Sequence, residues 1–179
     1  AEQAVARWEQ LLERRNSAKW RLALVEALLV SGRQFKDQQR LDEADARHER
    51  ALELVTSIEP DPLNRLLRRR VASTKNAVGV LIARRDVDRA LRLFSEAADE
   101  VRQLADLVPG ADYEILLAKI VNNHAQTLRL VSDLATAEKL LEQSRRRIER
   151  VAEANPDRID IQDQLTHTGV SLSALWVDS

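Results

Sequence analysis

The chain has 179 residues, and its 44% apolar and 32% charged residues are typical of a soluble globular protein rather than a disordered one. A formal net charge of −1 disfavours binding to nucleic acid or to a membrane surface, because such proteins normally carry a strong basic excess. The absence of cysteine excludes disulfides, thiolate metal sites and cysteine nucleophiles.

Long segments with helical periodicity, broken by a few prolines and poor in aromatic residues, predict an all-α fold. In chain order we expect a partial repeat, three full repeats and a second partial repeat. Their ranges are 1–17, 18–61, 62–110, 111–156 and 157–179, and the prolines that separate them are Pro60, Pro62, Pro109 and Pro156. Because each full repeat has room for two helices, we expect about eight helices in a single array over 1–179.

The full repeats carry small and bulky residues in register, at spacings of 46 or 47 residues. Two series of small residues set the register: Gly32, Gly79 and Ala125, and Ala44, Ala90 and Ala137. Two bulkier series follow them: Phe35, Ile82 and Leu128, and His48, Phe94 and Leu141. A further small series closes each repeat: Ala51, Ala97 and Ser144. Antiparallel helices approach closely where a small side chain faces the partner, so we expect helical hairpins that stack into an α-solenoid.

This pattern resembles the tetratricopeptide repeat, over nearly all of the chain. The similarity is greatest to long bacterial arrays whose first helix reads roughly "LNNLG", for which "TKNAVG" at 74–79 and "VNNHAQ" at 121–126 are degenerate copies. The resemblance implies a right-handed solenoid with a concave groove lined by the first helix of each repeat, within a larger bacterial signalling or regulatory protein. The period here exceeds the family's usual length of about 34 residues.

One polar stripe of each first helix should face that groove. In the third full repeat, Val121, His124, Ala125 and Leu128 are assigned to the partner helix, which leaves the stripe Lys119, Asn122, Gln126 and Arg129. The corresponding residues are Glu26, Leu29, Arg33 and Lys36 in the first full repeat, and Ser73, Asn76, Val80 and Ala83, with Arg84 beside them, in the second. The candidate peptide-binding residues are therefore Arg33, Lys36, Asn76, Arg84, Lys119, Asn122, Gln126 and Arg129.

An asparagine side chain offers both donors and an acceptor to the backbone of a bound peptide. The stripes carry several cations against Glu26 alone, so we predict an acidic peptide or a chain carboxylate as ligand. We expect no cofactor and no nucleic-acid partner. The alternative interpretation is that the stripe is merely solvated and that asparagine recurs because a parent repeat was duplicated.

Other motifs give little support to chemistry. The histidines His48, His124 and His167 lie in different repeats without a metal-binding frame, and we interpret His124 as a hairpin contact. No nucleophile elbow or phosphate-binding glycine loop is present, so we expect no enzyme. The arginine clusters at 65–70 and 145–150 raise phosphate binding as an alternative to solvated helix faces.

We therefore expect a non-catalytic protein–protein interaction module, located in the cytoplasm, with the periplasm as the alternative, and without a membrane segment. The second hypothesis is a structural segment that forms homo-oligomers through its apolar ends, at Trp8 on one side and at Leu172, Leu175 and Trp176 on the other. Because the chain lacks methionine, we also expect it to be a fragment of a longer protein.

Overall fold

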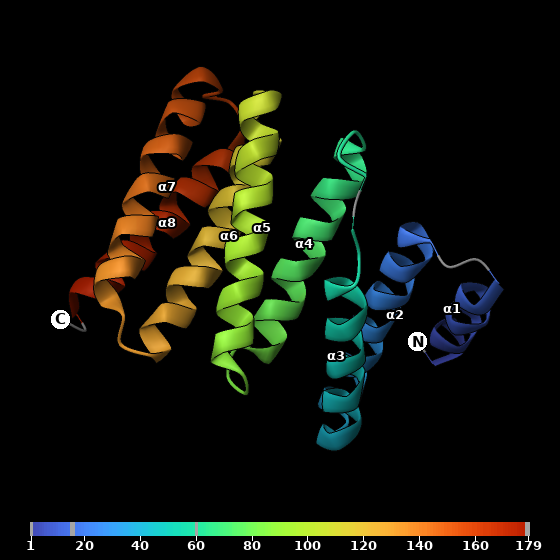
Figure 1. Ribbon diagram of the computed structural model, residues 1–179. Coiled ribbons are helices and arrows are strands. Elements are labelled where there is room, and N and C mark those ends of the chain that lie inside the picture. The colour runs from blue at the N-terminus through green and yellow to red at the C-terminus, as the bar shows by residue number, and fades with distance from the viewer. Residues whose placement is uncertain (1, 15–16, 60, 178–179) are drawn as a thin grey trace. The chain divides into compact units, whose positions relative to one another are not determined.

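The computed structural model describes residues 2–14, 17–59 and 61–177, with side chains described as far as residue 175. The regular secondary structure of these ranges is entirely helical, which confirms the predicted all-α class and helix number (Figure 1). The eight helices are α1 (Glu2–Arg14), α2 (Ala18–Asp37), α3 (Leu41–Thr56), α4 (Arg65–Ile82), α5 (Val87–Leu107), α6 (Ala111–Leu130), α7 (Leu134–Ala154) and α8 (Ile159–Val177). None of the described helices combines the length and the apolar character needed to cross a membrane.

The chain forms two compact units, Ala1–Ile82 with α1 to α4 and Ala83–Ser179 with α5 to α8. Within each unit, successive helices run in alternating directions and pack on their neighbours in the sequence (Figure 1). First helices also contact each other across a repeat, since α2 touches α4 and α6 touches α8. Each predicted repeat boundary lies between two helices, although Pro60 itself falls outside the described residues.

The turns after α2 and α6 reverse the chain in the same way. In each, a non-glycine residue adopts the left-handed conformation, Gln39 in one and Ser132 in the other, both with φ of 60°. The next backbone amide then donates to a carbonyl inside the helix, from Arg40 to Phe35 at 2.9 Å and from Asp133 to Leu128 at 3.1 Å. This bonding pattern is that of a Schellman motif, which satisfies carbonyls at the end of a helix.

Polar side chains cap the starts of several helices. Asn64, Asp86 and Asp133 each accept a hydrogen bond from the backbone amide three residues further on, at 3.0, 3.1 and 3.2 Å. These bonds satisfy amides of the first turn, which have no partner inside the helix. The starts of α4, α5 and α7 are thereby fixed by local sequence.

The repeat series forms the core of both units. All fifteen residues of the five series are buried, and Phe94, Ala90 and Ala97 are fully so. Gly32 shows why one series must be small: a Cβ built there would lie 2.5 Å from Nε2 of His48 in α3. A side chain at this position would therefore displace the buried His48 ring, while the nearest atom of the α3 backbone, the Ala44 carbonyl oxygen, would lie 3.4 Å away. The predicted packing role of the repeat series is confirmed.

Two of the three residues expected to form an exposed apolar end on α8 are buried. Leu172 and Leu175 are only 4% and 2% exposed, because α8 turns this side toward α6 and α7. Its exposed residues include Gln162, Thr166 and His167. The side chain of Trp176 lies outside the described residues. In the first unit, Trp8 is half-buried against Trp20, with ring centroids 5.2 Å apart.

Candidate functional site

The predicted groove residues are divided between the two units. The first unit holds Arg33, Lys36 and Asn76, and the second holds Arg84, Lys119, Asn122, Gln126 and Arg129. Lys119, Asn122, Gln126 and Arg129 share α6, and Arg33 and Lys36 share α2. Five of the eight are exposed: Arg33, Lys36, Arg84, Lys119 and Gln126. Asn76 and Arg129 are half-buried, and Asn122 is buried.

Asn122 does not face an open surface, and this is a correction of the sequence interpretation. It is 1% exposed, and its Nδ2 donates to the Ala118 carbonyl at 2.8 Å and to Oγ1 of Thr168 at 3.0 Å. Thr168 belongs to α8 and is itself fully buried. The asparagine amide is therefore a contact between two first helices. The equivalent residue of α2, Leu29, is also buried, at 7% exposure, in a helix that packs on α4.

The open stripe of α6 is turned about the helix axis relative to the predicted one. Its exposed members are Asp112, Lys119, Gln126 and Leu130, with Asn123 half-buried among them. Gln126 accepts a hydrogen bond from Arg129 through Oε1 at 2.9 Å. One signal in the sequence pointed to the true orientation: Thr168 follows Asn122 by 46 residues, one repeat, so two polar residues occupy equivalent places in neighbouring first helices.

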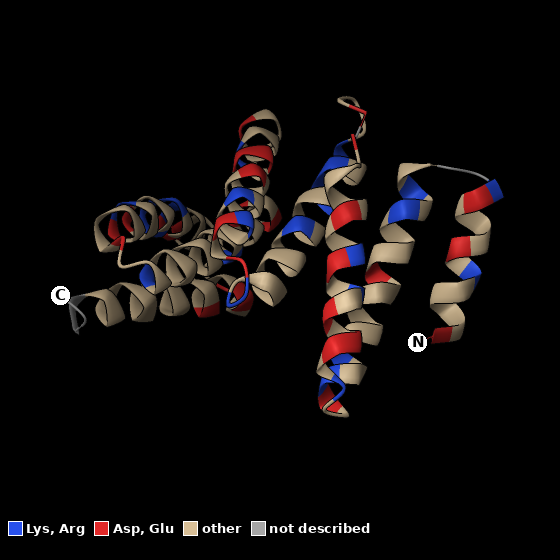
Figure 2. Ribbon diagram, turned by 60° about the horizontal axis from the view of Figure 1, so that its bottom comes forward, with Lys and Arg blue, Asp and Glu red and all other residues tan. Residues whose placement is uncertain are grey.

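The cations of the predicted surface are largely uncompensated. Among the residues that the structure describes, the side chains of Arg33, Lys36, Arg84 and Lys119 have no hydrogen-bond or ion-pair partner. Glu26, the one acid assigned to these stripes, is instead bound by Arg70 of α4 at 2.8 Å. Elsewhere the charges are mixed, as Figure 2 shows along α3 and α5. Positive charge without a described partner is therefore present on α2, in the turn after α4 and on α6.

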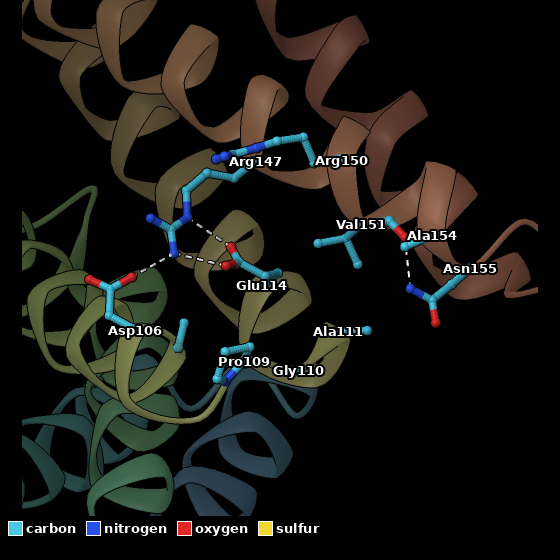
Figure 3. A pocket seen from close by; sticks show the side chains of 11 residues that line it. Asp106, Pro109, Gly110, Ala111, Glu114, Arg147, Arg150, Val151, Ala154 and Asn155 are labelled. Carbon is cyan, nitrogen blue, oxygen red and sulfur yellow. Dashed lines mark hydrogen bonds and ion pairs between the residues drawn. The ribbon is translucent and has the colours of Figure 1, made fainter.

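Two neighbouring hollows that the sequence did not reveal lie in the second unit, between α5 and α7 and over α6. Their volumes are about 580 and about 350 Å³, they share Arg147 and Arg150 as lining residues, and Figure 3 shows the larger of the two. We call these the outer and inner hollow, and both together the α6 trough. The outer hollow is lined by Ala105, Asp106, Pro109, Gly110, Ala111, Glu114, Arg147, Arg150, Val151, Ala154 and Asn155. The inner hollow is lined by Arg102, Leu117, Val121, Leu140, Gln143, Ser144, Arg146, Arg147 and Arg150.

Arg147 ties the three helices of the trough together. Its Nε and Nη2 donate to the two carboxylate oxygens of Glu114 at 2.9 and 2.8 Å, and Nη2 also reaches Asp106 at 3.2 Å (Figure 3). The hydrogen bonds that Arg147 donates to Glu114 raise the pKa of the Arg147 guanidinium, against the lowering effect of its partial burial. A two-point contact of this kind fixes orientation as well as charge, so α5, α6 and α7 are held in one arrangement.

Arg150 differs from the other arginines of the trough. Its Nε donates to the Arg146 carbonyl at 3.3 Å, and no described carboxylate pairs with it. By contrast, Arg146 pairs with Glu142 at 3.3 Å, and Arg102 pairs with Asp99. The trough therefore has one uncompensated cation at the place where its two hollows meet.

Histidine and metal chemistry have no visible centre in the described parts of the chain. The His124 ring is stacked on Phe94 of α5, with centroids 6.0 Å apart. Burial lowers its pKa, and the charge of Asp99 opposes that shift in part. Within the described ranges, no three residues among His, Cys, Asp and Glu are grouped as metal ligands would be. His124 thus packs between helices, as its position in the repeat predicts.

No protein-family model, no curated protein and no solved structure matches this chain. Its function is therefore inferred from its own residues.

Proposed function

We propose that the chain is a non-catalytic protein-interaction module, a right-handed solenoid of tetratricopeptide-like hairpins whose first helices bind an acidic segment of a partner protein. The observation that carries this proposal is the set of exposed cations without an internal partner: Arg33, Lys36, Arg84 and Lys119. A cation that stabilises nothing within its own fold keeps all its donors for a ligand carboxylate.

The packing of the first helices supports the same proposal. The buried repeat series fixes the first helices by their small residues, so the side chains on the open stripe are presented from rigid elements. Asn122 is left out of the proposed contact because its amide is bonded to Thr168. Gln126 and Arg129 remain, with Lys119, as the α6 part of the surface.

The resemblance of the repeat to bacterial tetratricopeptide arrays is the support for placing the module in a larger cytoplasmic signalling or regulatory protein. The binding of a partner would then change how that protein assembles. This part of the proposal is an analogy between sequences.

The test is charge reversal on α6. A fluorescein-labelled twelve-residue peptide rich in glutamate is titrated with the protein, and binding is followed by fluorescence anisotropy. We expect Lys119→Glu with Arg129→Glu to weaken binding at least about tenfold, because attraction becomes repulsion at two contacts. The matched control is Lys139→Glu with Arg145→Glu on α7, which makes the same change of charge at two exposed residues that line neither hollow. Equal affinity for the wild-type protein and the α6 variant would contradict the proposal.

The structural alternative, assembly through the ends, loses two of the four residues on which it was based, since Leu172 and Leu175 are buried; Trp8 is half-buried, and the side chain of Trp176 lies outside the described residues. Light scattering over a range of protein concentrations distinguishes the peptide-binding module from an assembly segment. We expect a monomer throughout, and a multimer that grows with concentration would favour assembly.

A further inference from the structure

We propose that the open stripe of α6 binds an extended peptide segment in which an acidic residue and a bulky apolar residue lie about five positions apart. Lys119 binds the carboxylate, Leu130 contacts the apolar side chain, and Gln126 donates to the peptide backbone between them. This inference rests on the proposed function, because it concerns the same surface. It adds a spacing in the ligand and an apolar contact residue, neither of which follows from the charges alone.

The three residues Lys119, Gln126 and Leu130 lie in a line along one side of α6. Gln126 and Leu130 follow Lys119 by seven and eleven residues. Successive residues of an α-helix are about 100° apart around its axis, so both steps return to within about 20° of the direction of Lys119. All three side chains are exposed. A ligand that lies along this side of the helix can therefore contact them in order.

The apolar end of the stripe is open to solvent. Leu130 is 56% exposed, and Val131, which follows it at the end of the helix, is 49% exposed. Along α6, which is described throughout, Leu130 is the one exposed large apolar side chain. An apolar ligand side chain placed here would cover surface that the fold leaves in water, which is favourable.

The polar part of the stripe has unused hydrogen-bond donors. Lys119 has no hydrogen-bond or ion-pair partner among the described residues, so its ammonium group can bind a ligand carboxylate. Gln126 accepts from Arg129 through Oε1 at 2.9 Å, which leaves Nε2 to donate to a peptide carbonyl. At the start of the stripe, Asp112 is bound by Arg158 at 2.9 Å, so its negative charge is compensated within the fold.

The length of the stripe sets the spacing in the ligand. The eleven residues from Lys119 to Leu130 rise by about 16 Å, at about 1.5 Å per residue. An extended chain advances about 3.3 Å per residue, so about five residues span the same distance. A helical ligand would need apolar contacts on several successive turns, and Leu130 alone provides one on this stripe. An extended segment is therefore the form that fits.

The experiment uses the whole chain and three labelled peptides with blocked ends. Each is symmetric about a central glutamate, so that both chain directions are tested together, and serine and glycine fill the other positions. The first carries leucine five positions before and after the glutamate, the second carries the leucines two positions away, and the third has alanine in place of leucine. By fluorescence anisotropy we expect the first to bind at least about fivefold more tightly than the others, because it alone spans both contacts.

The apolar contact is tested with a matched pair of leucine substitutions. Leu130→Ser should weaken binding of the first peptide at least about fivefold and change the affinity for the alanine peptide less than about twofold. Leu63→Ser is the control, because Leu63 is 89% exposed but lies in the connection between α3 and α4. It should leave the affinity for both peptides unchanged. Circular dichroism of both variants checks that helix content is preserved.

The outcomes separate this inference from the proposed function. If Lys119→Glu with Arg129→Glu weakens binding of all three peptides while the first and second bind equally well, the surface binds acidic segments without selecting a spacing, and this inference alone is wrong. It is also wrong if Leu130→Ser leaves the affinity for the first peptide unchanged. If the charge-reversal variant binds all three peptides as tightly as the wild type, the proposed function fails as well.

A fourth peptide tests the extended form of the ligand. It is an alanine-rich helix that carries glutamate and leucine eleven positions apart, the spacing that matches the stripe in a helical ligand. We expect it to bind more weakly than the first peptide, because its other turns have no apolar contact on α6. Tighter binding of the helical peptide would overturn the inference.

Discussion

A single glycine controls how closely α2 and α3 approach. A Cβ at Gly32 would lie 2.5 Å from Nε2 and 2.7 Å from Cδ2 of the buried His48. We expect Gly32→Ala to lower the free energy of unfolding by about 1–3 kcal/mol through overpacking. This cost exceeds the roughly 0.5–1 kcal/mol that alanine gains over glycine inside a helix. Urea unfolding followed by circular dichroism measures the difference.

The third full repeat provides the control for this substitution. Its equivalents of Gly32 and His48 are Ala125 and Leu141, a larger residue paired with one that lacks the imidazole ring. The double variant Gly32→Ala with His48→Leu copies that pair and should recover most of the lost stability. A single variant as stable as the wild type would mean that the His48 ring moves aside without cost, and that this contact does not require glycine at position 32.

At the scale of single residues, packing was predictable and orientation was not. Small residues that recur at a fixed spacing identify a close contact, because only the identity of the side chain matters there. Periodicity assigns Asn122 to an open stripe, because it lies beside the residues assigned to the partner helix, yet Asn122 lies between α6 and α8. Periodicity tells which residues share a face of a helix, but not which neighbouring helix covers that face.

Between elements, the Asn122–Thr168 contact joins α8 to α6. Thr168→Val should cost about 1–3 kcal/mol of unfolding free energy, because Nδ2 of the buried Asn122 loses its bond to Oγ1. Thr166→Val is the matched control: Thr166 also donates to the carbonyl four residues earlier, at 2.9 Å, but it is exposed. We expect less than about 0.5 kcal/mol at that site. Both values come from urea unfolding.

A double substitution tests whether Asn122 and Thr168 contribute to stability through their contact with each other. Asn122→Leu with Thr168→Val replaces both polar partners by apolar groups of similar size, and should be more stable than Thr168→Val alone. Additive effects of the two substitutions would show that the bond between α6 and α8 contributes nothing.

The sequence does not reveal the α6 trough, which, like the Asn122–Thr168 contact, is formed between helices. Arg102, Leu117 and Arg150 come from three helices, and no local spacing links them. The cluster at 145–150 was noted but interpreted as a solvated face, since Arg146 has Glu142 one turn away. Arg150 stands out only when the neighbours of every charge are known. The starts of α4 and α7, by contrast, are fixed by single local residues, Asn64 and Asp133.

Across the whole molecule, the division into two units predicts separate folding of the second. Residues 83–179 have their own core, with Phe94, Leu104, Ile120 and Ile148 fully buried. Arg147 ties three of its helices, and Arg158 binds Asp112 at 2.9 Å. We expect a fragment of residues 83–179 to show a helical circular dichroism spectrum and a cooperative thermal transition. A broad, non-cooperative transition would show that this unit depends on the residues before it.

The two matching turns after α2 and α6 bear on how such a chain evolves. The residues at 38–40 are Gln, Gln and Arg, and those at 131–133 are Val, Ser and Asp. The two turns therefore share no amino acid at equivalent positions. Both nevertheless accept a left-handed residue other than glycine, at a cost of roughly 1 kcal/mol, because the reversal uses only main-chain amides and carbonyls. Every amino acid except proline possesses both groups. The sequences of these turns can therefore diverge between repeats. Evidence for a common origin of the repeats should be sought in the spacing of their buried residues rather than in the loops.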